Sequence, residues 1–131
     1  MALMSEVYFL NGSLVTYNLH FESKGDDDLR QTQLDELLED VGRHDTLMPI
    51  VVAGDFNFDI SRTQVTNAIA RSGLVNPFAP LSVPIPTTHS AFSAGRTIDW
   101  ILLRGPLTAL NPQIHSSVTA SDHYPLTLTL A

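Results

Sequence analysis

One short apolar run with no polar alternation constrains the fold most strongly. Residues 49–54 read Pro-Ile-Val-Val-Ala-Gly. A strand with one face in water alternates apolar and polar residues, whereas a strand covered on both faces is apolar throughout. This run therefore predicts a central strand of a sheet, and the polar stretch that begins at Asp55 marks the end of that strand.

Further strands are predicted on both sides of this run. Asn-Gly at residues 11–12 separates two β-rich segments and predicts a hairpin whose second strand continues to Phe21. Residues 97–104 form another strand pattern, and residues 114–119 form a weaker one. Leucines alternate with threonines over residues 126–130, which predicts a last, half-buried strand.

Two helices are predicted between the strands. The acidic run at residues 26–28 favours the N-terminus of the first helix, with a cation site as the alternative. That helix ends near Gly42, and its apolar face comprises Leu34, Leu37, Leu38 and Val41. Ser61 and Gln64 form a capping box for the second helix, which Gly73 closes. Strands and helices in alternation indicate an α/β fold.

Length and composition exclude several classes of protein. The 131 residues suffice for one domain, and 44% of them are hydrophobic, which excludes extensive disorder. No cysteine is present, so disulfides and cysteine-ligated zinc are excluded. No apolar run approaches the ~18 residues of a membrane span, and the first residues lack the features of a signal peptide. We therefore expect no membrane span, and these features favour the cytoplasm.

The charge is unevenly distributed. Twelve of the fourteen acidic residues and three basic residues lie at or before Asp59, giving −9, whereas four arginines and two acids follow it, giving +2. The acidic first part disfavours a broad nucleic-acid-binding face, because phosphate neutralisation needs clustered Lys and Arg. Asp99 and Asp122 are the only later carboxylates, and each lies beside an apolar, strand-like run.

The first candidate cluster is Asp55 with Asn57. An acid and an amide two residues apart in an extended segment point the same way, and carboxyl ends of strands bind ligands in open α/β sheets. The alternative is that Asp55 caps the helix near Ser61. The second candidate, Asp99, lies inside a strand, where a carboxylate needs a partner such as a histidine. Its alternative partners are the backbone and Arg96.

The third cluster is Asp122 with His123, just before the last strand, where a carboxylate and an imidazole can serve a metal and a proton transfer. His20 joins the list because it shares a strand face with Asn18. Arg96 could hold a phosphate, although a solvated arginine at a strand start is the simpler interpretation. The other histidines, at positions 44, 89 and 115, are interpreted as surface or loop residues.

Taken together, these clusters resemble the endonuclease/exonuclease/phosphatase family, the DNase I-like metal-dependent phosphoesterases. Gly-Asp-Phe-Asn at residues 54–57 matches a family motif fully, and Ser-Asp-His-Tyr-Pro at residues 121–125 matches its Ser-Asp-His-x-Pro ending. Asn-Leu-His-Phe at residues 18–21 is similar to Asn-Thr-His-Leu, and Ile-Asp-Trp-Ile at residues 98–101 to Ile-Asp-Tyr-Ile/Phe. Four motifs in the family's order over nearly the whole chain make the resemblance specific.

The resemblance implies catalytic roles. Asp55 would orient or deprotonate the attacking water. His123, oriented by Asp99, would act as a base or stabilise the charge of the transition state. His20 would contact the phosphate or assist the leaving group. The substrate is a phosphate ester, and its class is left open.

The resemblance also implies residues for substrate and metal. Asn57 would hold a phosphate oxygen, and Asn18 and Arg96 are further substrate-binding candidates. Asp122, with Asp55, would bind the divalent cation directly or through water. Mg2+ (or Mn2+) suits such a site, because Mg2+ is bound through few carboxylates plus substrate oxygens.

The implied fold is the C-terminal half of a DNase I-like four-layer α/β sandwich, with one mixed sheet and helices on one face. Residues 1–131 would form a single truncated domain. The family's Gln-Glu metal-binding motif does not occur in the sequence, and its early Asn is also missing. We therefore expect either a metal-dependent phosphoesterase that is weak or inactive as an isolated half, or a non-catalytic interaction or scaffold module.

Half of such a sandwich would leave one face of its sheet without helices, whereas the apolar run at residues 50–53 predicts that both faces are covered. At ~25 cal/mol per Å2, covering ~800 Å2 of apolar surface contributes on the order of 20 kcal/mol before association costs. We therefore expect a homodimer with sheet packed on sheet, or a separate chain that carries the N-terminal half.

Overall fold

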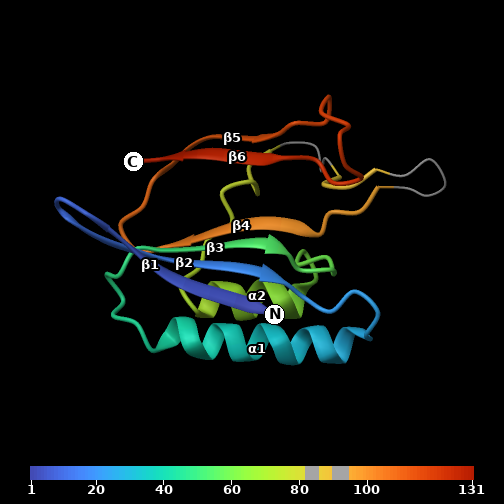
Figure 1. The fold of residues 1–131 in the computed structure, drawn as a ribbon. Helices are drawn as coiled ribbons and strands as arrows, with labels where there is room; N and C mark the ends of the chain where they lie inside the picture. The colour runs from blue at the N-terminus through green and yellow to red at the C-terminus, as the bar shows by residue number, and fades with distance from the viewer. Residues whose placement is uncertain (82–85, 90–94) are drawn as a thin grey trace.

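Strands and helices alternate along the chain in the computed structural model, which describes residues 1–81, 86–89 and 95–131. Figure 1 shows their arrangement. In chain order the elements are β1 (Ala2–Phe9), β2 (Gly12–His20), α1 (Asp27–Gly42), β3 (Ile50–Asp55), α2 (Thr63–Arg71), β4 (Asp99–Arg104), β5 (Ala109–Ile114) and β6 (Leu126–Leu130). The predicted α/β class is confirmed.

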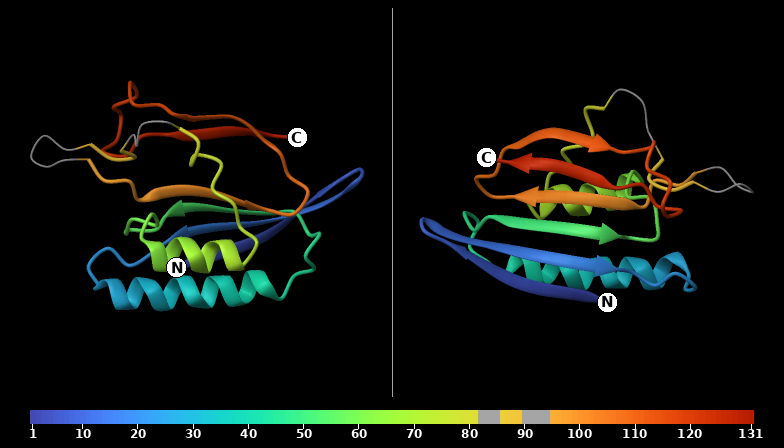
Figure 2. Two further views of the ribbon diagram at one scale, coloured as in Figure 1. Left: turned by 180° about the vertical axis from the view of Figure 1, so that it is seen from behind. Right: turned by 45° about the horizontal axis from the view of Figure 1, so that its top comes forward.

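Four of the strands form one mixed sheet in the order β1-β2-β3-β4. The hairpin β1–β2 is antiparallel, β2 and β3 run parallel with α1 as the crossover, and β3 and β4 are antiparallel. β5 and β6 pair as a separate antiparallel ribbon, which lies beside β4 (Figure 2). This topology brings the ends of β2 and β3 and the start of β4 to one edge of the sheet.

The core lies between one face of the sheet and the two helices, which both cover that face (Figure 1). Alternate residues of β2 and β3 point toward α1, whose apolar residues follow the predicted one-sided spacing. The helix also begins as predicted, because the Asp26 carboxylate accepts a hydrogen bond from the Leu29 N–H at 3.0 Å. Members of this core include Val15, Tyr17, Leu19, Leu34, Leu37, Val41, Ile50 and Val52.

The opposite face of the sheet, here called the open face, carries no helix within the described residues. In β3, Ile50 and Val52 are fully buried against the helices, whereas Val51 and Ala53 on the open face are only half-buried. The prediction that both faces of β3 are covered is therefore met fully on the helix-covered face and only in part on the open face. In β1, Leu3 and Phe9 point to the open face and are 64% and 59% exposed.

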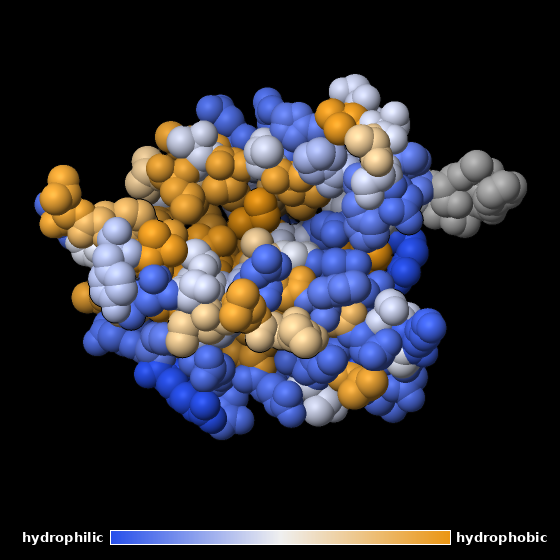
Figure 3. Space-filling model, viewed as in Figure 1, coloured by the Kyte–Doolittle hydropathy of each residue, from blue (hydrophilic) through white to orange (hydrophobic). Residues whose placement is uncertain are grey.

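Apolar side chains also line a hollow where the open face meets the β5–β6 ribbon. Figure 3 shows apolar groups gathered in this part of the surface. The hollow is lined by residues of the β1–β2 hairpin, by residues of the ribbon and by residues just before β3 and β5, among them Phe9, Leu14, Pro49, Leu107 and Leu130. Phe9, on the open face of β1, borders this hollow.

The predicted capping box of the second helix is wrong. The Ser61 N–H donates to Asp59 Oδ1 at 2.9 Å, so Ser61 belongs to a turn and the helix starts later. α2 begins at Thr63, with Arg62 at the N-cap position and no side-chain cap. The predicted end is confirmed, because Gly73 follows α2 with a φ of 78°.

The strand predicted at residues 114–119 is also wrong, because β5 lies earlier, at Ala109–Ile114. A bulge between Leu110 and Gln113 interrupts its pairing with β6, and Asn111 inside it has a φ of 52°. This irregularity removes the alternation that a sequence pattern needs. The last strand, Leu126–Leu130, is confirmed.

Two smaller predictions need adjustment. The hairpin is confirmed, but Phe9 pairs with Gly12, so the turn residues are Leu10 and Asn11. The prolines of residues 75–88 predict a long irregular loop; Val75 nevertheless forms a bridge with Leu103, and residues 82–85 lie outside the described residues. Among the described residues, no helix combines the length and hydropathy that crossing a membrane requires.

Candidate active site

Three strands deliver polar side chains to one edge of the open face. In the β2–β3 register His20 lies opposite Asp55, and in the β3–β4 register Asp55 lies opposite Asp99. Paired residues of neighbouring strands point to the same face of a sheet. The three side chains therefore share the open face, with the apolar core of the sheet behind them.

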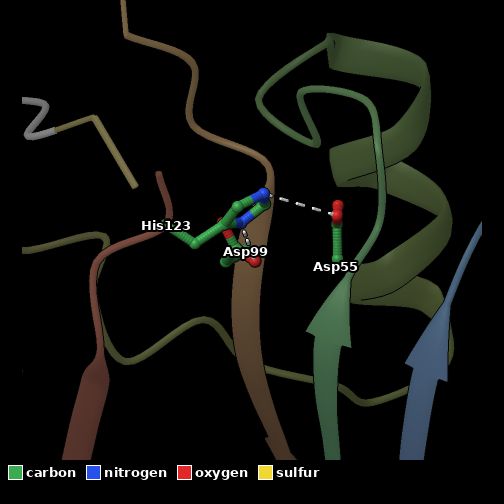
Figure 4. A group of neighbouring side chains, drawn as sticks. All are labelled: Asp55, Asp99 and His123. Atoms are coloured by element: carbon green, nitrogen blue, oxygen red, sulfur yellow. Dashed lines mark hydrogen bonds and ion pairs between the residues drawn. The ribbon is translucent and has the colours of Figure 1, made fainter. Parts of the chain in front are cut away.

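His123 reaches the same point from the loop before β6. Its Nδ1 lies 2.8 Å from Asp99 Oδ2 and 3.0 Å from Asp99 Oδ1 (Figure 4). An ionised carboxylate only accepts hydrogen bonds, so Nδ1 carries the proton and donates it. Nε2 of the neutral ring is then an acceptor, and it faces Asp55 Oδ2 at 4.0 Å. Asp99 is thus partnered by a histidine and not by Arg96.

The two carboxylate oxygens of Asp55 differ: Oδ1 accepts a hydrogen bond from the backbone, whereas Oδ2, here called the open oxygen, faces the site. Oδ1 accepts the backbone N–H of Asn57 at 2.7 Å. Oδ2 lies 3.7 Å from His20 Nε2 and 4.0 Å from His123 Nε2, which exceeds a direct hydrogen bond. Oδ2 therefore faces two imidazole nitrogens without a direct hydrogen bond to either. Asp55 is not a helix cap, because α2 begins at Thr63.

Burial is the main influence on Asp99. Desolvation raises the pKa of its carboxyl, while the hydrogen bond from His123 acts in the opposite direction and does not cancel the increase. The carboxylate accepts that bond from His123 Nδ1 on a partly buried strand. Asp99 is therefore suited to orienting His123 and poorly placed to meet a substrate directly.

Asn57 lies at the site with its side chain turned inward. Its Nδ2 donates to the Phe21 carbonyl at 2.9 Å, and the residue is buried, with a φ of 53°. Its own carbonyl accepts from the Arg96 guanidinium at 2.9 Å. Asn57 thus joins the end of β2 to the loop after β3, and Arg96 supports that loop. The predicted phosphate contacts of both residues remain predictions.

Two other predicted residues lie around the cluster. Asn18 is exposed on the open face of β2, two residues before His20 and opposite Ala53. Asp122 is exposed, its Oδ1 accepts from Ser121 Oγ at 3.3 Å, and its carboxylate does not join the cluster. Its role as a metal ligand remains a prediction.

The donor set suits a hard divalent cation. Asp55, Asp99 and His123 offer ligand atoms that all lie within 4.8 Å of one another. Both Asp99 oxygens face His123 Nδ1, so Asp55 Oδ2 is the carboxylate oxygen that is free to bind an ion. One protein carboxylate supplemented by substrate oxygens and water is a typical magnesium environment.

Sequence reasoning missed one residue of the site, Thr87. Its side chain is 1% exposed, and its hydroxyl contacts the backbone at the start of β4. It lies in a proline-rich stretch that predicts only a loop, and no spacing rule connects it with Asp99. His89, interpreted as a surface or loop residue, stacks on Tyr124 beside His123, with ring centroids 4.9 Å apart.

Comparison with known proteins found similarity over most of the chain. A sequence model of the Endonuclease/Exonuclease/phosphatase family matches residues 6–123. A comparison with curated proteins found no match.

Solved structures share the fold at low sequence identity. A humanized D. rerio TDP2 with 14 mutations has a TM-score of 0.77 and 20% identity, over 99% of this chain and 60% of that chain. D. rerio TDP2 in complex with a single-strand DNA product has a TM-score of 0.74 and 19% identity, over 99% and 61%. The mannosyl-6-phosphatase Bt3783 of Bacteroides thetaiotaomicron has a TM-score of 0.60 and 19% identity, over 91% and 51%. The chain spans about half to three-fifths of the length of these structures.

Proposed function

Because the chain belongs to the endonuclease/exonuclease/phosphatase family, we propose that it hydrolyses phosphate esters with the help of a divalent cation. The observation that carries this proposal is the His123–Asp99 pair, whose free Nε2 is aimed at the open oxygen of Asp55. An oriented imidazole opposite a carboxylate is an arrangement for moving a proton of water.

Each side chain has a distinct task in this proposal. A water held between Asp55 Oδ2 and His123 Nε2 attacks the phosphorus, and its proton passes to one of these two acceptors. Asp99 keeps His123 in the tautomer that leaves Nε2 free and stabilises the imidazolium if His123 takes the proton. His20, 69% exposed beside Asp55, contacts a phosphate oxygen or protonates the leaving oxygen as the ester bond breaks.

Asp55 would hold the cation, together with phosphate oxygens and water. When bound, Mg2+ or Mn2+ supplies positive charge that stabilises the transferring phosphoryl group. The absence of a Gln-Glu motif from the sequence predicts weak affinity, since the family's metal-binding Glu would come from that motif.

The proposal is tested by hydrolysis of bis(p-nitrophenyl) phosphate at 5 mM MgCl2 or MnCl2. We expect activity that EDTA abolishes. His123→Gln should lower kcat by at least about 100-fold, because it removes a general base. The matched control is His115→Gln, whose ring contacts Thr127 outside the site.

Equal activity of parent and His123→Gln would contradict the proposed site. A folded parent with no activity would favour the second candidate function, a non-catalytic interaction or scaffold module. The observation in favour of that candidate is that Asp55 Oδ2 is the one carboxylate oxygen of the described cluster that is free to bind a cation.

The substrate we favour is a small phosphate ester. The similar structures include one with a DNA product and one named for a sugar phosphate, so the fold accommodates both classes. The net charge of −7 disfavours long nucleic acid, because electrostatic attraction to phosphates needs positive surface. A parallel assay on single-stranded DNA and hexose 6-phosphate distinguishes the classes.

The open face is proposed to bind a second copy of the chain. Leu3 and Phe9 on this face are 64% and 59% exposed, and an interface with a second copy would remove these apolar side chains from water. A separate chain that supplies the rest of the family domain is the alternative occupant. Sedimentation equilibrium of the purified chain decides between a dimer and a monomer.

A further inference from the structure

Asp99 and His123 lie 24 residues apart in the sequence, and one short segment connects their backbones. The Thr87 N–H donates to the Arg96 carbonyl at 2.8 Å, near the start of β4. On the other side, the Tyr124 N–H donates to the Thr87 carbonyl at 2.7 Å. Thr88 continues this pairing as a β-bridge with His123. The segment around Thr87 therefore lies between the strand of Asp99 and the loop of His123.

The Thr87 side chain adds three hydrogen bonds to the same junction. Its Oγ1 accepts the N–H of Ile98 at 2.9 Å and the N–H of Asp99 at 3.0 Å, and it donates to the Arg96 carbonyl at 3.2 Å. A hydroxyl has one hydrogen and two lone pairs, so its capacity is fully used. With the residue 1% exposed, water has no access to replace these bonds.

We propose that Thr87 is a positioning residue whose hydroxyl fixes the backbone that carries Asp99, while its peptide group fixes the loop that carries His123. Without the hydroxyl, the N–H groups of Ile98 and Asp99 lose their acceptor, and the start of β4 must shift to satisfy them. Asp99 would then no longer hold His123 Nδ1 at 2.8 Å. The proposal rests on the proposed function in one respect: the His123–Asp99 pair is given a role in hydrolysis. The positioning of that pair by Thr87 does not depend on activity.

The neighbouring threonine provides a matched control. Within the part of the chain that the structure describes, Thr88 Oγ1 hydrogen-bonds only with Arg96, accepting its N–H at 2.8 Å and donating to its carbonyl at 3.2 Å. Thr87→Val and Thr88→Val therefore each remove one threonine hydroxyl, from adjacent residues. Of these two hydroxyls, only that of Thr87 accepts the backbone N–H of Asp99. Thr87→Ser keeps the hydroxyl and removes the methyl group.

The decisive measurement is the tautomer of His123, read from two-bond 1H–15N correlations of the metal-free protein in EDTA. This readout does not need activity, so it separates the present proposal from the proposed function. We expect the Nδ1–H tautomer in the parent, in Thr87→Ser and in Thr88→Val. In folded Thr87→Val we expect a mixture of tautomers. In an active parent, Thr87→Val should also lower kcat by about 10- to 100-fold and leave KM within about twofold.

Two results would overturn the proposal. One is a folded Thr87→Val that keeps the parent's His123 signals. The other is a folded Thr87→Ser that loses them, because the methyl group and not the hydroxyl would then be the important part. If Thr87→Val does not fold, Thr87→Ala, which removes the same hydroxyl, takes its place: a folded Thr87→Ala with a mixture of tautomers supports the proposal, and one with the parent's His123 signals overturns it.

Discussion

At the scale of single residues, the site depends on hydrogen bonds that commit one atom of a side chain and leave another free. Asp55 uses Oδ1 for the Asn57 N–H and keeps Oδ2 open. His123 uses Nδ1 for Asp99 and keeps Nε2 open. The open atoms face one another because their committed partners hold them in place. This pre-organisation is what distinguishes the cluster from an ordinary pair of surface acids and a histidine.

Tyr17 lies on the helix-covered face of β2, away from the site, and its hydroxyl has two partners on or next to α1. Its hydroxyl donates to Asp40 Oδ2 at 2.7 Å and lies 2.9 Å from His44 Nε2. Burial, and then the hydrogen bond to Asp40, raise the pKa of Tyr17 strongly. In the unfolded chain the phenol ionises near its usual pKa of about 10. Folded-state stability from this group is therefore complete below about pH 10 and is lost as the pH rises further.

We predict that Tyr17→Phe lowers the free energy of unfolding by about 1 kcal/mol at pH 7, through loss of the hydroxyl contacts. Above about pH 10 the variant should lose stability less steeply than the parent, because it has no phenol to ionise. Urea unfolding at pH 7, 10 and 11 measures both effects. Tyr8→Phe, at an exposed position, is the control. Parallel curves for parent and Tyr17→Phe above pH 10 would contradict the prediction.

At the scale of elements, the close contact between β2 and β3 sets the geometry of the site. The two strands are parallel neighbours, and Gly54 pairs with Leu19 one residue before Asp55. A Cβ at Gly54 would clash with the Leu19 carbonyl oxygen, and the φ of Gly54 is 144°. The glycine of the Gly-Asp-Phe-Asn motif is therefore required by the backbone of the neighbouring strand.

We predict that Gly54→Ala destabilises the fold by more than about 4 kcal/mol, because neither backbone can move without breaking the sheet pairing. Gly42→Ala is the matched control: no atom lies within 4 Å of its added Cβ, and alanine favours the helix by up to about 1 kcal/mol. Thermal unfolding followed by circular dichroism compares the two. A Gly54→Ala variant with the parent's midpoint would show that this contact is not restrictive.

At the scale of the whole molecule, both helices cover one face of the sheet, and the open face carries no helix within the described residues. The site lies on that open face, so whatever covers the face also borders the site. Leu3 and Phe9 on β1 are the most exposed apolar residues there, and the apolar hollow at the ribbon adjoins Phe9. Association would remove these side chains from water and close one side of the site.

We predict that Phe9→Lys shifts the chain from dimer to monomer in sedimentation equilibrium, because the introduced charge would have to be buried in the interface. The matched control is Tyr8→Lys, because Tyr8 is 75% exposed and points to the opposite face. This control should sediment as the parent does. A monomeric parent at micromolar concentration would refute the dimer.

Much of the architecture could be predicted from local patterns. The apolar run of β3, the alternation in β2 and β6, and the acidic start of α1 each depend on interactions within a few residues. The predictions failed where another contact in the folded chain overrode the local sequence pattern. Ser61 resembles a helix cap, but Asp59 binds its N–H first, and the bulge at residues 110–113 hides the alternation of β5.

For the site, the residue pattern predicts which chemical groups are available and that they lie at or near strand ends: Asp55 at the end of β3, Asp99 at the start of β4 and His123 before β6. Their arrangement depends on contacts between distant parts of the chain. The pairing of Asp55 with His20 and Asp99 follows from strand register, and the orientation of His123 follows from hydrogen bonds over 24 residues. The position of Thr87 between them, and the separation of Asp122 from the cluster, have no local signal at all. Spacing rules describe a residue's own strand or helix, whereas these contacts depend on which strands become neighbours.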